Sequence, residues 1–271
     1  MISLYDMVIP FIVNLLLLFA ALKLKLLTVS GSVASFLLGF IVFYFMNFVG
    51  WLILVFFFVS ANILGKVGKL VKQVDISKIH KKGETRDWVQ VFANGGIAGI
   101  AALFYGLTGS IIPLVMFGAS LAASTADTWA SEAGILSSEN PVSILTFTPV
   151  TPGMSGGVSW LGSLSSIIGS ILISSLWYVS YRIAGDFRFF LLASIIALSG
   201  IAGSLVDSYL GATVQGHYWD PINELVTERE RSDDVVFELC RGIRWIDNDI
   251  VNLMSNVVST LLAGGLTLIV L

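Results

Sequence analysis

The feature that most constrains this chain is a series of apolar segments, each about as long as the hydrocarbon core of a bilayer is thick. A membrane-spanning helix needs about 20 mostly apolar residues, with a usable range of about 17–25. Such segments fill most of the 271 residues, and only 12% of the residues are charged, whereas soluble domains average about 25%. The mean hydropathy is +0.88. The sequence therefore predicts an all-α, polytopic transmembrane helical bundle that forms a single integral membrane domain over residues 1–271.

The apolar segments divide the chain into eight expected spans. The segment Val29–Leu64 is too long for one span, and Asn47–Gly50 offers a break within it, so we expect two spans there. Seven spans remain if that segment is a single helix. The other spans are expected at Val8–Leu27, Trp88–Leu107, Ser110–Ala130, Gly157–Tyr181, Phe187–Gly211 and Ile250–Leu271.

Hydrophilic segments separate these spans and define the expected organisation. We expect the segment Ala212–Asp247 to be partly helical, and Glu224–Glu238 within it to be a solvated helix at the membrane interface rather than part of a site. The chain then divides into N-terminal spans (1–64), a basic loop (65–87), a core of two helical hairpins (88–215), a charged loop (216–248) and a last span (249–271).

The positive charges predict how the bundle is oriented. Cytoplasmic loops of membrane proteins hold the excess of Lys and Arg. If the N-terminus lies outside, Arg182 and Arg188 are the two of the 15 Lys and Arg residues that fall on the outer side. Asp127, the turn at Pro152–Gly157 and Asp207 then reach the cytoplasmic face together. We therefore expect a single site that faces the cytoplasm.

Two carboxylates, Asp127 and Glu132, stand near the end of an apolar segment. An ionisable side chain at membrane depth costs about 2.5–3.5 kcal/mol on insertion scales, so it usually faces the protein interior or a wet cavity. At helical spacing, Asp127 shares a face with the hydroxyl groups of Ser124, Thr128 and Ser131. Such a face suits a hard cation such as Mg²⁺. The alternative is a polar helix end at the level of the lipid headgroups.

The segment Thr148–Gly157 is a turn rich in Gly and Pro that leads into an expected helix. Backbone N–H groups at a helix N-terminus bind anions, and glycines let the backbone approach phosphate oxygens closely. The segment is not a Walker A motif, because no Gly-Lys-Ser/Thr follows it. It is a candidate phosphate-binding turn, and the alternative is a re-entrant turn that needs Gly and Pro only for its geometry.

Asp207 ends one expected span in the way that Asp127 ends an earlier one. Gly200, Gly203 and Ser204 share a face with Asp207, and small residues let membrane helices pack closely, but packing does not account for the carboxylate. Both hairpins open with a Gly-Gly pair and close with Asp, a hydroxyl residue and an aromatic residue. We hypothesise an internal duplication that brings the two aspartates to one face.

The basic loop carries Lys81, Lys82 and Arg86 ahead of Gln90 and Asn94, which follow on one face of the next expected helix. Loops on the cytoplasmic side are basic in any case, and anionic headgroups attract them. The polar continuation just inside the membrane favours a role in phosphate binding for the residues nearest that helix.

Few other side chains suggest a metal or redox site. The single Cys240 excludes an internal disulfide. His80 and His217 are isolated and have no partner at the spacing of a metal site.

Four motifs together resemble those of a known family. The segments Arg86–Gly96, Ala126–Glu132, Pro152–Ser159 and Gly203–Ala212 occur in the same order in the integral membrane family that includes plant phytyl-phosphate kinase. The resemblance covers about residues 86–215, and the N-terminal spans match only in being hydrophobic. That family is more distantly similar to dolichol kinase and CDP-diacylglycerol synthase. Met154 is a departure, because the family's turn reads Pro-Gly-Thr and supplies a hydroxyl group there.

The resemblance implies a kinase that uses Mg²⁺ and CTP, or another nucleoside triphosphate, to convert a prenyl monophosphate of the phytyl or geranylgeranyl class into the diphosphate. Phosphoryl transfer depends mainly on positioning and charge neutralisation. The implied partners are the lipid substrate, the nucleotide and the membrane, and no nucleic acid is expected. The implied catalytic residues are Asp127, Asp207, Lys82 and Arg86; the implied metal ligands are Asp127, Glu132, Asp207 and Ser131; the implied nucleotide- or phosphate-binding residues are Asn94, Gly153, Ser155, Gly156, Gly157, Gln90, Ser208 and Gln215.

Two other functions remain open from the sequence. A transporter or scramblase of isoprenoid or other anionic lipids would also use duplicated helix pairs and intramembrane carboxylates. Such a protein should continue its polar path toward the opposite side, where the sequence offers only Arg182, Asp186 and Arg188. A nucleotidyltransferase of the CDP-diacylglycerol synthase type would keep the fold but leave the nucleotide in its product.

Overall fold

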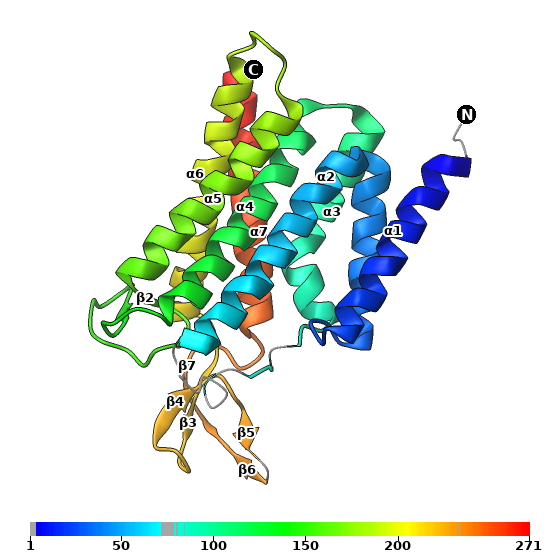
Figure 1. The fold of residues 1–271 in the computed structure, drawn as a ribbon. Helices are drawn as coiled ribbons and strands as arrows, with labels where there is room; N and C mark the ends of the chain where they lie inside the picture. The colour runs from blue at the N-terminus through cyan, green and yellow to red at the C-terminus, as the bar shows by residue number, and fades with distance from the viewer. Residues whose placement is uncertain (1–3, 72–78, 80, 84, 233) are drawn as a thin grey trace.

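The structure is a computed structural model that describes residues 4–71, 79, 81–83, 85–232 and 234–271. Its helices form a membrane-type bundle, and short strands lie at one end of it (Figure 1). This confirms the predicted all-α polytopic architecture. The helices are α1 (Leu4–Lys23), α2 (Val29–Val71), α3 (Trp88–Thr108), α4 (Ile111–Gly134), α5 (Trp160–Tyr181), α6 (Arg188–Thr213) and α7 (Asn248–Val270).

Helix α2 contains the predicted break. Its 43 residues would extend about 64 Å as one straight helix, about twice the hydrocarbon thickness of a bilayer. Asn47 interrupts the helix with φ 58° and ψ −173°, and Figure 1 shows that the chain turns back there, so the two halves run in opposite directions. Among the described residues, six helices are long and apolar enough to cross a bilayer, and Met7–Lys23 is a shorter apolar helix. Counting α2 twice gives eight passes.

Helix α4 lies at the centre of the bundle and packs against α2, α3, α5, α6 and α7. Close approach is possible because small residues face its neighbours. A Cβ added at Gly200 would lie 2.7 Å from the Cβ of Ala122, and one at Gly118 would lie 2.9 Å from the ring of Trp177. Trp177 also donates its indole N–H to the carbonyl of Leu114 (3.0 Å). The predicted close packing of small residues is therefore present.

The segment between α6 and α7 differs from the prediction of a partly helical loop. It forms an antiparallel sheet in the order β4 (Leu225–Thr227), β3 (His217–Asp220), β7 (Glu238–Arg241), together with a hairpin of β5 (Arg231–Ser232) and β6 (Val235–Val236). Aromatic and β-branched residues favour pleated, half-buried surfaces, and Tyr218 is buried while Trp219 is exposed. The expectation of an interfacial helix at Glu224–Glu238 is wrong, because β4, β5 and β6 lie within that segment and pair as antiparallel strands.

A second correction concerns the start of α5. Strands β1 (Val142–Ser143) and β2 (Gly157–Val158) pair antiparallel, so Gly157 belongs to a strand and not to the expected span. Ser159 caps the helix by accepting a hydrogen bond from the Gly162 N–H (3.1 Å), and α5 begins at Trp160.

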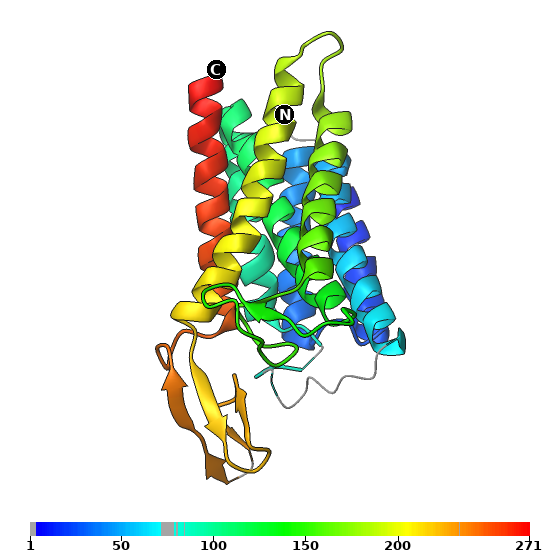
Figure 2. The same cartoon turned by 90° about the vertical axis from the view of Figure 1, so that its left-hand side faces the viewer.

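All segments that carry the motifs reach the same end of the bundle, while the start of α1 and the end of α7 lie at the other end (Figures 1 and 2). Trp88, Trp160 and Trp245 are exposed at or just before the starts of α3, α5 and α7. Exposed tryptophans gather where membrane helices meet water. We infer that the helices leave the bilayer at this level and that the strands lie outside it. The assignment of this end to the cytoplasm stays a prediction.

Candidate functional site

A cavity of about 770 Å³ opens at the end of the bundle that carries the strands. Helices α2 to α7 contribute to its wall, together with the segments before α2 and α3 and the turn at Pro152–Gly157. Of the predicted site residues, Gln215 does not line the cavity. Those that do are Lys82, Arg86, Gln90, Asn94, Asp127, Ser131, Glu132, Gly153, Ser155, Gly156, Gly157, Asp207 and Ser208.

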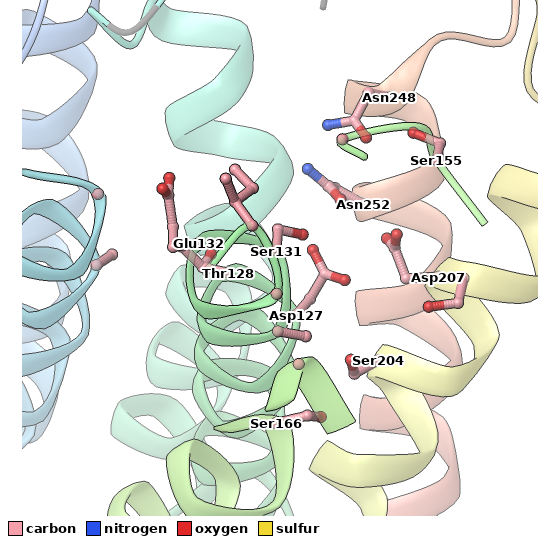
Figure 3. A pocket seen from close by; sticks show the side chains of 18 of the residues that line it. Asp127, Thr128, Ser131, Glu132, Ser155, Ser166, Ser204, Asp207, Asn248 and Asn252 are labelled. Atoms are coloured by element: carbon pink, nitrogen blue, oxygen red, sulfur yellow. The ribbon is translucent and has the colours of Figure 1, made fainter. Parts of the chain in front are cut away.

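The predicted pair of aspartates meets in this cavity. Figure 3 shows the carboxyl groups of Asp127 on α4 and Asp207 on α6 turned into the same space. Asp207 is buried and accepts a hydrogen bond from the Ser255 hydroxyl (3.0 Å). Two carboxylates held this closely within a membrane protein carry a large desolvation cost unless a cation or a shared proton neutralises them. The arrangement therefore suits a bound cation.

The full set of four predicted metal ligands is not assembled. In Figure 3, Glu132 lies away from the pair, on the side of α4 that faces α2. A Cβ added at Gly65 would lie 3.2 Å from the Glu132 carboxylate. Among the residues that the structure describes, no group of three or more His, Cys, Asp or Glu side chains could hold a metal ion. Asp127 and Asp207 remain as a two-carboxylate site with the hydroxyl of Ser131 nearby, and Mg²⁺ commonly takes one or two carboxylates plus substrate phosphates.

Glu132 instead interacts electrostatically with the Arg86 side chain. Burial lowers the pKa of Arg86, and the Glu132 carboxylate opposes that shift. The backbone of Arg86 is fixed by two hydrogen bonds to the α1–α2 connection, from its N–H to the Leu26 carbonyl (3.2 Å) and from the Thr28 N–H to its own carbonyl (3.0 Å). The N-terminal spans thus position one of the two predicted phosphate-binding cations.

Lys82 is the second cation, and it is held between two carboxylates. Its ammonium group donates to Asp87 (2.8 Å) and to Asp249 at the start of α7. Burial alone would lower the pKa of Lys82, but these two hydrogen bonds raise it above the ordinary value. Lys82 is therefore charged at the rim of the cavity. A phosphate arriving there would have to compete with Asp87 and Asp249.

The first turn of α3 is a capping box. The side chain of Asp87 accepts from the Gln90 N–H (2.9 Å), and the Gln90 side chain accepts from the Asp87 N–H (3.0 Å). This reciprocal arrangement satisfies two N–H groups at the helix start. The oxygen of the Gln90 side chain is therefore used in the fold. Its expected role as a support for phosphate, which would use the side-chain NH2 group, stays a prediction. The Asn94 side chain donates one of its two amide N–H groups to the backbone carbonyl of Gln90 (3.1 Å), and its expected role in phosphate binding stays a prediction as well.

The Gly-rich turn differs in detail from the predicted cradle of backbone N–H groups. The N–H of Gly157 donates to the Met154 carbonyl (3.0 Å), so it is not available to a phosphate. Gly153 and Gly156 adopt φ of 89° and 82°, which glycine tolerates best. The turn closes on itself and presents Ser155. The hydroxyl of Ser155 donates to Glu228 and accepts from the Gln215 side chain (3.1 Å), so Gln215 supports the turn from behind.

Sequence reasoning missed a group of polar residues that β4 and α7 bring to the cavity. Glu228 is buried directly after β4, and its N–H donates to the Ile79 carbonyl (2.9 Å). Asn252 follows one turn after Asn248, and both line the cavity (Figure 3). The signal for α7 was present, since Asn248, Asn252 and Asn256 recur at four-residue spacing and two of them lie inside an apolar span. Glu228 had no such signal.

Comparison with known proteins agrees with this description. Residues 12–260 match the family described as integral membrane protein DUF92. The chain belongs to this family. Protein PGR of Arabidopsis thaliana is 33% identical over 281 residues, which cover 96% of each chain. An uncharacterized membrane protein of Methanocaldococcus jannaschii is 34% identical over 193 residues (70% of this chain, 75% of the relative), and one of Synechocystis is 26% identical over 216 residues (78% and 81%).

No solved structure matches the chain. The names of these three relatives state a membrane location for two of them and no activity for any of the three. The site must therefore be interpreted from its own chemistry.

Proposed function

We propose that this DUF92 protein is a kinase that transfers the γ-phosphoryl group of CTP, or another nucleoside triphosphate, to a prenyl monophosphate. The proposal is carried by one observation: two intramembrane aspartates, Lys82 and Arg86 all line one cavity at the membrane surface. Opposite charges arranged around a space of this size suit a polyanionic ligand with its counter-cation. The motif resemblance supplies the choice of prenyl phosphate as acceptor and CTP as donor.

The residues divide between holding the cation and holding phosphate. Asp127 and Asp207 would bind Mg²⁺, which when bound neutralises charge on the phosphoryl group being transferred. Lys82 and Arg86 would neutralise the remaining phosphate oxygens from the rim. Asn252 offers an amide toward the same cavity, whereas the Ser155 hydroxyl is held by Glu228 and Gln215. Transfer of this kind depends on positioning and electrostatics, without a covalent intermediate on the protein.

No strong general base is needed for this reaction. The acceptor is a phosphate monoester, whose second pKa is about 6, so its attacking oxygen is ionised near neutral pH. The task of the protein is then to bring two anions together and to exclude competing water. A wall formed by buried residues of α4, α6 and α7 on one side of the cavity suits that task.

A lipid transporter is the second candidate, and one observation favours it. Polar side chains continue from the cavity into the bundle between α4 and α7: the Asn256 amide donates to Ser124 (2.7 Å) and its oxygen accepts from Ser120 (2.6 Å). These groups are buried and bonded to one another, which is also what a polar contact between packed helices requires. The proposed kinase does not need a path beyond this layer.

One experiment separates the candidates. Purified protein would be incubated with Mg²⁺, geranylgeranyl monophosphate in vesicles, and CTP that carries label in either the α- or the γ-phosphate. The kinase should transfer γ-label, and no α-label, into a prenyl diphosphate. Transfer of α-label would identify a nucleotidyltransferase. If neither label enters lipid with any nucleoside triphosphate, the kinase proposal fails, and movement of the lipid between vesicle leaflets would then be measured.

A further inference from the structure

The cavity reaches the bilayer-facing surface of the bundle between α5 and α6. Ile167 is 39% exposed and Leu205 is 55% exposed, although both also line the cavity. At these two side chains the cavity wall is at the same time the outer surface of the bundle. Figure 2 shows α5 and α6 diverging toward the end that carries the strands.

The opening between the two helices has definite limits along α6. On the side toward the α5–α6 loop, the Ser170 hydroxyl donates to the Ala197 carbonyl (2.7 Å), and a Cβ at Gly200 would lie 2.3 Å from the Ser170 hydroxyl. On the other side, the Gly-rich turn packs on α6, because a Cβ at Gly211 would lie 3.0 Å from the Gly156 nitrogen. From Gly200 to Gly211 the helix rises about 16 Å, about half of the hydrocarbon thickness.

The side chains along this opening change from apolar to polar toward the inside. Ile167 and Leu205 stand at the surface, while Ser166 and Ser204 are buried one residue before each of them and line the cavity. Figure 3 shows Ser166 and Ser204 on neighbouring helices with Asp127 and Asp207 beyond them. A molecule that enters here passes from an apolar lip, through hydroxyl groups, to the charged part of the site. That order matches a lipid with a hydrocarbon chain and a phosphate head.

We propose that the opening between α5 and α6 is the lateral entrance for the lipid monophosphate, with its hydrocarbon chain between Ile167 and Leu205 and its phosphate in the cavity. The inference rests on the proposed function in one respect, the choice of a lipid monophosphate as ligand. The nucleotide then enters from water, where Lys81, Lys82 and Asn248 line the other end of the cavity.

The first test uses tryptophan to fill the lip of the opening. Leu205→Trp and Ile167→Trp would be compared with Leu198→Trp, a matched control: Leu198 is 63% exposed on the same face of α6, two turns away, and does not line the cavity. Each variant would be assayed with geranylgeranyl monophosphate in vesicles and with water-soluble dimethylallyl monophosphate. We expect the ratio of kcat/KM for the long acceptor over the short one to fall at least about tenfold in the two lip variants and to stay unchanged in the control.

A lower ratio in the Leu198→Trp control, or an unchanged ratio in both lip variants, would overturn the entrance. A wild-type protein inactive on both acceptors would count against the proposed kinase instead. The entrance would then be tested by binding alone, with geranylgeranyl monophosphate that carries a photoreactive diazirine in its chain. Crosslinks should map to residues 160–181 and 188–213 and should be competed by unlabelled lipid phosphate but not by the free alcohol. Crosslinks confined to α1 and α2, or not competed by the phosphate, would contradict the proposal.

Discussion

Replacing Gly156 by alanine tests how the Gly-rich turn is held against α6. Gly156 has φ 82°, and a Cβ there would lie 2.5 Å from the Cβ and 2.6 Å from the backbone nitrogen of Ala212. An alanine in the left-handed region costs about 1–2 kcal/mol, and forcing extra volume into a packed contact costs about 1–3 kcal/mol more. We therefore expect Gly156→Ala to destabilise the protein by about 2–5 kcal/mol in total.

Gly185→Ala is the matched control, because Gly185 has nearly the same φ (84°) and a Cβ there would have no atom within 4 Å. Both substitutions change the entropy of the unfolded chain equally, so their difference isolates the contact with Ala212. Unfolding would be followed by denaturant or heat in one detergent. Gly156→Ala should be less stable than Gly185→Ala by about 1–3 kcal/mol. Equal losses of stability would refute the described packing of the turn on α6.

Substitutions at three further positions test other parts of the structure. Asp87→Ala should cost about 1 kcal/mol by removing the cap of α3, while Asp87→Asn should cost less because an amide oxygen still caps; equal costs would mean that the lost ion pair with Lys82 dominates. Burial and the neighbouring Arg241 lower the pKa of His217 to about 4. The neutral imidazole therefore contributes fully to the free energy of unfolding above about pH 6.5, and roughly 3 kcal/mol of that free energy should be lost as the pH falls toward 4. Denaturant titrations should show this loss in the wild type and not in His217→Gln. Asn47→Gly should raise the melting temperature and Asn47→Val should lower it, because the Asn47 backbone angles favour glycine; the opposite order would argue against the break in α2.

The parts of the fold that depend on local pattern were predictable. The lengths of the apolar segments predicted the spans. The break at Asn47 lies inside the segment that was too long for one span. The meeting of Asp127 and Asp207 followed from position alone, since each stands one to two turns before the end of a helix that descends to the same side. The two-fold resemblance of the hairpins stays a hypothesis, and the hairpins α3–α4 and α5–α6 do run in the same sense (Figure 1).

The parts that depend on pairing over long sequence separations were not predictable. Strands β3, β4 and β7 are short, and charged residues intervene, so the segment lacks the sustained alternation that reveals a strand. Its fold brings Glu228 to Ser155, 73 residues away. Lys82 likewise meets Asp249, 167 residues away. The sequence pattern indicated Lys82 and the turn as site elements, but not Asp249 and Glu228, which bind them.

The central claim is that Asp127 and Asp207 form one site for phosphoryl transfer, and the rate of γ-label transfer to geranylgeranyl monophosphate tests it most directly. Asp127→Asn, Asp207→Asn, the double variant and Glu139→Gln, an exposed carboxylate outside the cavity, would be compared after their folding is checked by thermal unfolding. We predict that each single variant loses at least about 100-fold in kcat/KM, that the double variant loses no more than the worse single variant, and that the control retains wild-type activity. Folded single variants that transfer label at the wild-type rate, or losses that multiply in the double variant, would contradict the account.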